Sequence, residues 1–271
     1  MKFLRIAVSV IFCAAVCIFA VFYAKDRKSD KTLPVITIEN ELLEVSLQAN
    51  EDELRQGVTA YDAKDGDITP KIIVESVSKF TEPGVSIVTY AVCDNDNHTA
   101  VARRKIRYAG YEPPVFSMSD DLVFTLSERV SILSRIHASD LIDGDISERI
   151  VITAADYEAN ISGVFKISAR ATNSKGDVIY LNIPLYVEDI SSASPEIKLS
   201  EYLVYIGAGE RFDPRAFLVS AADVNGEDLT DSVRIDSTLD TNTPGTYQVH
   251  FYAADSAGRQ QHSVLTVIVE G

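Results

Sequence analysis

The chain has 271 residues, enough for two or three domains, because single hydrophobic cores stop growing near that length. Its formal net charge is −15, and residues 32–271 alone carry −19 because residues 1–31 carry +4. This strongly acidic balance argues against nucleic acid and anionic lipid as partners. Only three cysteines are present, two of them in the first twenty residues, which excludes a disulfide framework in the rest of the chain.

An uninterrupted apolar stretch occupies residues 6–24, with no charge, proline or glycine. As a helix it would be roughly 28 Å long, close to the thickness of the hydrocarbon core of a bilayer. We therefore expect residues 1–31 to form a membrane anchor and juxtamembrane segment, with the membrane as partner through residues 6–24. A cleaved signal peptide is the alternative, since Lys2 and Arg5 precede the stretch, but Phe22 and Tyr23 make a poor cleavage site.

From residue 34 onwards one pattern occurs three times. Each copy begins with a proline and a short alternating strand, passes through an eight-residue acidic loop into an apolar run, and turns at a glycine into a longer strand. The prolines are Pro34, Pro114 and Pro195, and the turn glycines are Gly84, Gly163 and Gly245. The repeats predict domains at 32–110, 111–190 and 191–271.

Short strands, frequent turn residues and the lack of a helical period predict that each repeat is a two-sheet β-sandwich. Aligning the repeats also predicts which side chains face the core, because alternate residues of a strand point to opposite faces. In the strand after the turn glycine, and then in the last strand, these are Val88, Tyr90, Val92, Ile106 and Tyr108 in the first repeat, Ile167, Ala169, Ala171, Leu185 and Val187 in the second, and Val249, Phe251, Ala253, Val267 and Val269 in the third.

The third repeat, with "YIGAGERFDPRAFLVSAADVNGEDLT", "TPGTYQVHFYAADSAGRQ" and "VLTVIVE", resembles the bacterial immunoglobulin-like domain of surface proteins and pesticidal crystal proteins, which is related to hyalin repeats. The first two resemble it through "AYDAKDGDIT" and "ASDLIDGDIS", although they lack Gly207 and Gly209 and the second has Asn173 where the others have Asp. The resemblance implies an all-β chain of three tandem immunoglobulin-like β-sandwiches after one N-terminal transmembrane helix. It also implies an extracellular spacer or adhesive role and names no ligand.

Two of the acidic loops are candidate calcium sites, because calcium prefers six to eight oxygen ligands and a glycine turn can gather carboxylates. The candidates are Asp62, Asp65 and Asp67 in the first repeat, and Asp140, Asp143 and Asp145 in the second. The alternative is a turn whose Asp side chains bind nearby backbone N–H groups. The third repeat favours the turn, since Gly226 stands at the position of Asp65. We therefore expect no cofactor, with calcium in these loops as the alternative.

Motifs of catalysis are missing: there is no Gly-x-Ser-x-Gly, His-Glu-x-x-His or phosphate-binding loop, and the four histidines occur singly. We therefore expect a non-catalytic, membrane-anchored protein of the cell membrane, single-pass, with its soluble part outside, acting as a surface spacer, adhesion or binding module. Because an acidic chain can pair carboxylates, an accessory or hydrolytic module acting on envelope glycans is the alternative.

The outward side of one strand in the first repeat is unusually apolar, running from Val85 and Ile87 to Cys93. The next strand should lie beside it and present Arg103, Lys105 and Arg107. An apolar strip beside a basic row could contact an acidic or aromatic partner, either a protein or a cell-envelope glycan. The alternative is that a neighbouring strand or linker covers the strip.

Overall fold

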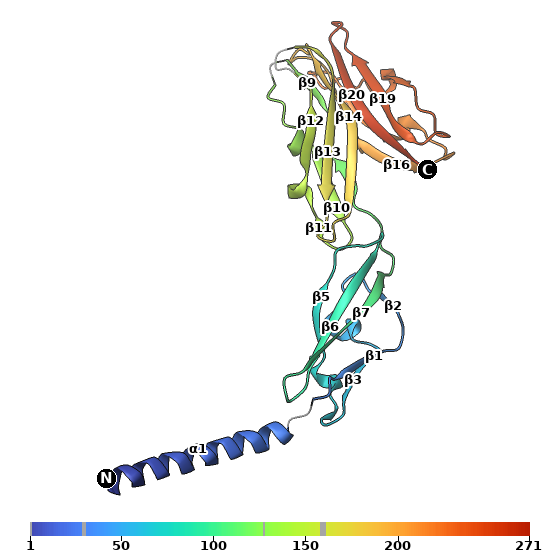
Figure 1. The fold of residues 1–271 in the computed structure, drawn as a ribbon. Helices are drawn as coiled ribbons and strands as arrows, with labels where there is room; N and C mark the ends of the chain where they lie inside the picture. Colours follow the sequence, from blue (N-terminus) through green and yellow to red (C-terminus); the bar gives the residue numbers. More distant parts are fainter. Residues whose placement is uncertain (1, 29–30, 127, 158–160) are drawn as a thin grey trace. The chain divides into compact units, whose positions relative to one another are not determined.

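The computed structural model describes residues 2–28, 31–126, 128–157 and 161–271 (Figure 1). The chain divides into two compact units, Met1–Ala109 and Gly110–Gly271. The first begins with helix α1, Lys2–Lys28. Residues 1, 29 and 30 of the expected N-terminal segment lie outside the described residues, as do the side chains of residues 2–7 and 24–28. Among the residues that are described, no helix is long and apolar enough to cross a membrane, so the expected transmembrane segment is not supported.

The first repeat is a sandwich of two sheets. One has the order β1-β3-β4 and the other the order β2-β7-β6-β5, in which β2 runs parallel to β7. Its elements are β1 Val35–Ile38, β2 Leu42–Val45, α2 Glu51–Leu54, β3 Val58–Asp62, β4 Gly66–Asp67, η1 Thr69–Lys71, β5 Ile73–Val77, β6 Val85–Cys93 and β7 Thr99–Tyr108.

The second repeat has the same arrangement, with sheets β11-β10-β8 and β12-β13-β14-β9 and with β9 parallel to β14. Its elements are β8 Val115–Met118, β9 Val123–Thr125, η2 Ile132–Ser134, β10 Ile136–Asp140, β11 Gly144–Asp145, η3 Ser147–Arg149, β12 Val151–Ala155, β13 Gly163–Thr172 and β14 Val178–Glu188.

The third repeat has sheets β15-β17 and β16-β20-β19-β18, with β16 parallel to β20. Its elements are β15 Glu196–Leu199, β16 Leu203–Gly207, η4 Pro214–Phe217, β17 Leu218–Ala222, η5 Thr230–Ser232, β18 Arg234–Ser237, β19 Gly245–Ala254 and β20 Gln260–Glu270. The predicted all-β fold built of β-sandwiches is therefore confirmed.

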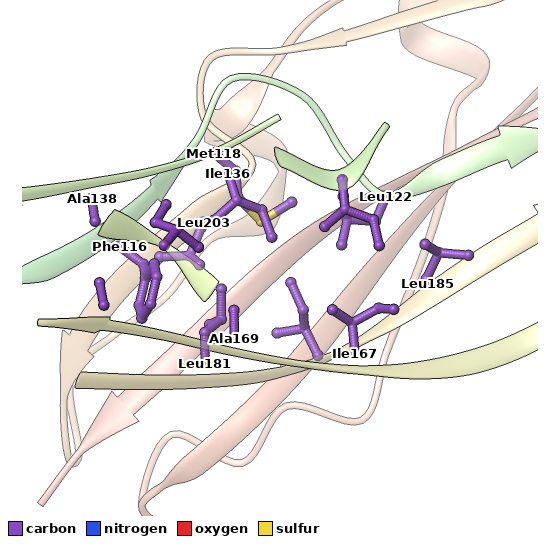
Figure 2. Packing of buried hydrophobic residues seen from close by; sticks show 14 of the residues in the cluster. Phe116, Met118, Leu122, Ile136, Ala138, Ile167, Ala169, Leu181, Leu185 and Leu203 are labelled. Carbon is purple, nitrogen blue, oxygen red and sulfur yellow. The ribbon is translucent and has the colours of Figure 1, made fainter. Parts of the chain in front are cut away.

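The core residues predicted from the repeat alignment are all buried. In the second repeat, Phe116 and Ile136 of the small sheet face Ala169 and Leu181 of the large sheet (Figure 2). Leu203 of the third repeat belongs to the same cluster. The third repeat also has its own core cluster, so Leu203 joins two otherwise separate cores, and burial of its apolar surface contributes to holding the two repeats together.

Candidate functional site

The acidic loops of the first two repeats are turns closed by aspartate side chains. Oδ1 of Asp62 accepts the backbone N–H groups of Lys64 and Asp65, both at 2.9 Å. Asp140 does the same for Ile142 at 2.9 Å and Asp143 at 2.8 Å. Such hydrogen bonds satisfy backbone donors that a tight turn leaves without partners.

The remaining loop carboxylates also have their own partners. Oδ1 of Asp67 accepts the N–H of Thr69, and Oδ1 of Asp145 accepts that of Ser147, each at 2.9 Å. Hydrogen bonds from the side chain and backbone of these partners hold the pKa of both aspartates below the usual range.

Asp65 and Asp143 tie each loop to the hairpin between the last two strands of its own repeat. Oδ2 of Asp65 accepts the N–H of Asn95 at 2.7 Å, and Oδ2 of Asp143 accepts that of Ser174 at 2.6 Å. Because the carboxylates point to separate backbone groups, the loops fit the turn interpretation. Within the described part of the chain, no cluster of three or more His, Cys, Asp or Glu could hold a metal ion.

The two loops differ at one buried atom. Oδ2 of Asp140 accepts the side-chain amide of Asn173 at 3.0 Å. The first repeat has Asp94 at that position, and its carboxylate instead accepts the N–H of His98 at 2.7 Å and contacts the His98 ring at 2.8 Å. Among the described residues, Oδ2 of Asp62 is buried and has no hydrogen-bond partner. The first repeat therefore lacks one stabilising contact that the second repeat has.

The predicted contact strip in the first repeat is shorter than expected. Strand β6 pairs with β7 in a register that sets Val85 opposite Arg107 and Ile87 opposite Lys105. Val85, however, is only 4% exposed, which corrects its placement on the outer surface. The segment before β6 turns back toward Val85: the backbone N–H of Thr81 donates to the Val85 carbonyl at 2.8 Å.

The other members of the strip lie at the surface. Ile87 is half-buried, Cys93 is exposed, and Arg103, Lys105 and Arg107 are exposed along β7. Lys105 forms an ion pair with Glu82 at 3.0 Å. The role of these residues in partner contact stays a prediction.

A buried arginine in the same strand was not predicted. Arg104 is 2% exposed, and its guanidinium donates to the carbonyls of Gln56 at 2.7 Å and Leu54 at 2.6 Å. It also donates to the hydroxyl of Tyr90 at 2.8 Å. Arg104 thereby donates hydrogen bonds to carbonyls at and just after the C-terminal end of helix α2. The only sequence signal was a basic residue at an inward position of β7.

A groove of about 1130 Å³ lies between the second and third repeats. The hydroxyl of Tyr205, which lines the groove, accepts the backbone N–H of Phe116 from the second repeat at 3.1 Å. Tyr180, 68% exposed, lines the side of the second repeat. Phe212 and Phe217, stacked with ring centroids 5.2 Å apart, line the side of the third. The groove thus combines aromatic surfaces from both repeats.

The same groove is strongly acidic. The described residues that line it include five carboxylates and one basic residue, Arg211. Two of the carboxylates are engaged locally, since Glu210 accepts the N–H of Gly207 at 3.0 Å and Asp213 accepts that of Arg215 at 3.0 Å. The other three are Glu112, Glu201 and Glu270. Sequence reasoning missed this site, because it exists only where two repeats pack together.

The architecture defines a protein of tandem immunoglobulin-like β-sandwiches. Residues 200–269 match the family model of the bacterial surface protein Ig-like domain. The third repeat thus matches the bacterial surface Ig-like family, which confirms the predicted resemblance for that repeat.

Two relatives match at the level of sequence. The pesticidal crystal protein Cry22Aa of Bacillus thuringiensis is 32% identical over 140 residues, which are 50% of this chain and 19% of that protein. An uncharacterized 81.3 kDa protein of Acholeplasma phage L2 is 28% identical over 171 residues, 60% of this chain and 23% of that protein. The chain thus matches less than a quarter of either relative's length.

The similar solved structures include distant matches. The M60 catalytic domain with the CBM51-1 and CBM51-2 domains of Clostridium perfringens ZmpB has a TM-score of 0.25 at 15% identity, covering 87% of this chain and 30% of that one. Drosophila N-cadherin EC1-4 has a TM-score of 0.25 at 11% identity, covering 88% and 76%. These similarities are too low to bear on function.

Proposed function

We propose that this chain is a non-catalytic binding and adhesion module of a bacterial surface, and that the groove between its second and third repeats binds a glycan of the cell envelope. The groove carries the proposal. Its volume is comparable with that of pockets that hold small ligands, and it presents aromatic rings together with a few polar groups.

The chemistry of the groove suits sugar rings. The exposed ring of Tyr180 offers a flat apolar surface for the C–H face of a pyranose. Carboxylates such as Glu201, and the side-chain amide of Asn182, can accept hydrogen bonds from sugar hydroxyls. The excess of carboxylates favours neutral or amino sugars over acidic ones, because like charges repel.

The surface location is supported by the family of the third repeat. Tandem sandwiches with a recessed site between two of them can bind a polymer without changing it. A binding module of this kind needs neither a nucleophile nor a bound metal.

The test uses the full chain and two insoluble glycan polymers in a sedimentation assay: purified peptidoglycan sacculi, and chitin as a plain polymer of N-acetylglucosamine. We expect the chain to sediment with at least one of them and to release no soluble sugar over hours. Failure to sediment with either would contradict glycan binding. Release of soluble sugar would contradict the non-catalytic function and favour the hydrolytic alternative.

A further inference from the structure

Three titratable side chains form a continuous hydrogen-bonded chain across the joint between the second and third repeats. Glu188 ends strand β14 of the second repeat, whereas His250 and His262 lie on β19 and β20 of the third. Oε1 of Glu188 is 2.7 Å from Nδ1 of His262, and Nε2 of His262 is 2.9 Å from Nδ1 of His250. His262 is only 5% exposed, so this chain belongs to the packed joint.

The two imidazole rings are held in the orientation of a hydrogen bond. Their centroids are 5.1 Å apart and their planes differ by 19°, and the 2.9 Å between Nδ1 of His250 and Nε2 of His262 places these two nitrogens toward each other. Tyr252 stacks on His262 with centroids 4.7 Å apart and planes 7° apart. Tyr186 meets both imidazoles edge-on, at 5.7 Å and 5.3 Å. These neighbours on β14 and β19 restrict rotation of the rings.

The arrangement limits how many protons the closed joint can hold. Nδ1 of His262 faces a carboxylate and therefore carries hydrogen, which leaves Nε2 of His262 to accept from Nδ1–H of His250. A first additional proton can bind the outer Nε2 of His250 without breaking either hydrogen bond. A second would need the lone pair of His262 Nε2, and the two rings would then face each other with N–H groups and like charges.

We propose that Glu188, His262 and His250 form a proton-controlled latch, which closes the joint while the histidine pair holds at most one extra proton and opens it when both rings are charged. This inference goes beyond the proposed function and does not depend on what the groove binds.

Other charged groups around the latch set the direction of the pH effect. Burial and the neighbouring His262 hold the pKa of His250 below its ordinary value, although Asp236 and Glu188 act to raise it. Arg234 lies over the Tyr252 ring at 4.3 Å and forms an ion pair with Asp236 at 2.6 Å. The pKa of His250 is depressed in the closed joint. The stability that neutral His250 gives the joint is therefore present above the ordinary histidine pKa of about 6.5 and is lost as the pH falls.

Asp121, in the connection between β8 and β9, has the opposite pH effect on the joint. It is 7% exposed, and its oxygens accept the N–H of Val123 at 3.1 Å and, across the joint, that of Val264 at 3.2 Å. Burial raises the pKa of Asp121 to about 6, so its neutral form is favoured in the closed joint. Asp121 therefore stabilises the closed joint as the pH falls through 6. In the intact chain Asp121 should therefore offset part of the weakening by acid, and Asp121→Asn should expose the full histidine effect.

The test measures the distance across the joint by double electron–electron resonance. Spin labels are attached at Lys166→Cys on β13 and Thr238→Cys after β18, both exposed positions, in a chain with Cys13, Cys17 and Cys93 changed to serine. In the Asp121→Asn background we expect one narrow distance distribution at pH 7.5 and a growing second population toward pH 5. Proton linkage allows the open-to-closed ratio to rise up to about tenfold per pH unit.

Two histidine variants identify the group responsible. In His250→Gln the amide can either donate to or accept from His262 Nε2, so protonation no longer forces the joint open and the pH-dependent population should disappear. His137→Gln, a histidine of the second repeat outside the joint, should keep the dependence. A distribution that does not change with pH, or one whose change survives His250→Gln, would overturn the proposal.

Ring ¹⁵N spectra of the chain without spin labels provide a check that needs no variant. We expect one of the two joint histidines to stay neutral in the closed form down to the pH at which the joint opens. Both rings becoming imidazolium while the joint remains closed would equally overturn the latch.

Discussion

The side-chain amide of Asn173 donates to Oδ2 of Asp140 at 3.0 Å, and this contact closes the acidic loop of the second repeat. Changing Asn173→Asp replaces the donor with a carboxylate that faces another carboxylate. We expect the free energy of unfolding of the second unit to fall by about 1–3 kcal/mol at neutral pH, because a buried acceptor loses its partner. Urea unfolding followed by circular dichroism measures the change. Asn182→Asp, at an exposed position, is the control and should have little effect; equal loss in both variants would contradict this explanation.

Calcium should change the stability of the chain very little. The loop aspartates bind backbone N–H groups, and among the described residues they do not gather into a three-ligand metal cluster. A bound ion at a hundredfold excess over its dissociation constant would stabilise the folded state by about 2.7 kcal/mol. Thermal unfolding with calcium and with a chelator checks this. A rise of several degrees that disappears in Asp65→Asn/Asp67→Asn would restore the calcium site.

Arg104 and Arg103 are neighbours in β7 with opposite expected effects. Arg104→Met removes the guanidinium that donates to the carbonyls of Leu54 and Gln56. The Leu54 carbonyl keeps the hydrogen bond from the Tyr90 hydroxyl, so we expect a total loss of roughly 1–3 kcal/mol. Arg103→Met changes an exposed side chain and should stay within about 0.5 kcal/mol. Denaturant unfolding of both variants, compared with the unchanged chain, gives the answer. Similar stabilities for the two variants would show that Arg104 is dispensable.

Cys93 should react in the folded protein. It is exposed at the end of β6, and its thiol lies 3.4 Å from the Asp94 carbonyl. In a Cys13→Ser/Cys17→Ser chain we expect a thiol reagent to label Cys93 in the native state nearly as fast as in denaturant, because access controls the reaction at fixed pH. Labelling that requires unfolding would mean that the strip from Ile87 to Cys93 is covered, and would remove it as a contact surface.

The sequence was most informative where a pattern recurs within one repeat. Alternation along β6, β13 and β19 identified Tyr90, Ile167 and Phe251 as core residues, since each strand of a sandwich has one buried face. The burial of such positions follows from the alternation of residues along a single strand. Turn chemistry was equally readable, because Asp62 and Asp140 bind backbone groups two and three residues away.

Contacts between distant segments were not readable from those patterns. Arg104 donates to carbonyls 48 and 50 residues earlier in the chain. The alternation of inward and outward residues along β7 therefore gave no reason to expect a charged side chain on the inner face. The contact of Glu188 with His262, 74 residues apart, depends on how two repeats pack. Repeat alignment treats each repeat separately and therefore describes neither the joint nor the groove beside it.

Glycan binding in the groove is the central claim, and Tyr180 tests it most directly. The measurement is isothermal titration of the full chain with soluble fragments of whichever polysaccharide sediments with it. Tyr180→Ala removes the exposed ring and should weaken binding about tenfold or more, whereas Tyr61→Ala, an equally exposed tyrosine of the first repeat, should leave the affinity unchanged. Unchanged affinity in Tyr180→Ala, or equal losses in the two variants, would contradict a binding site in the groove.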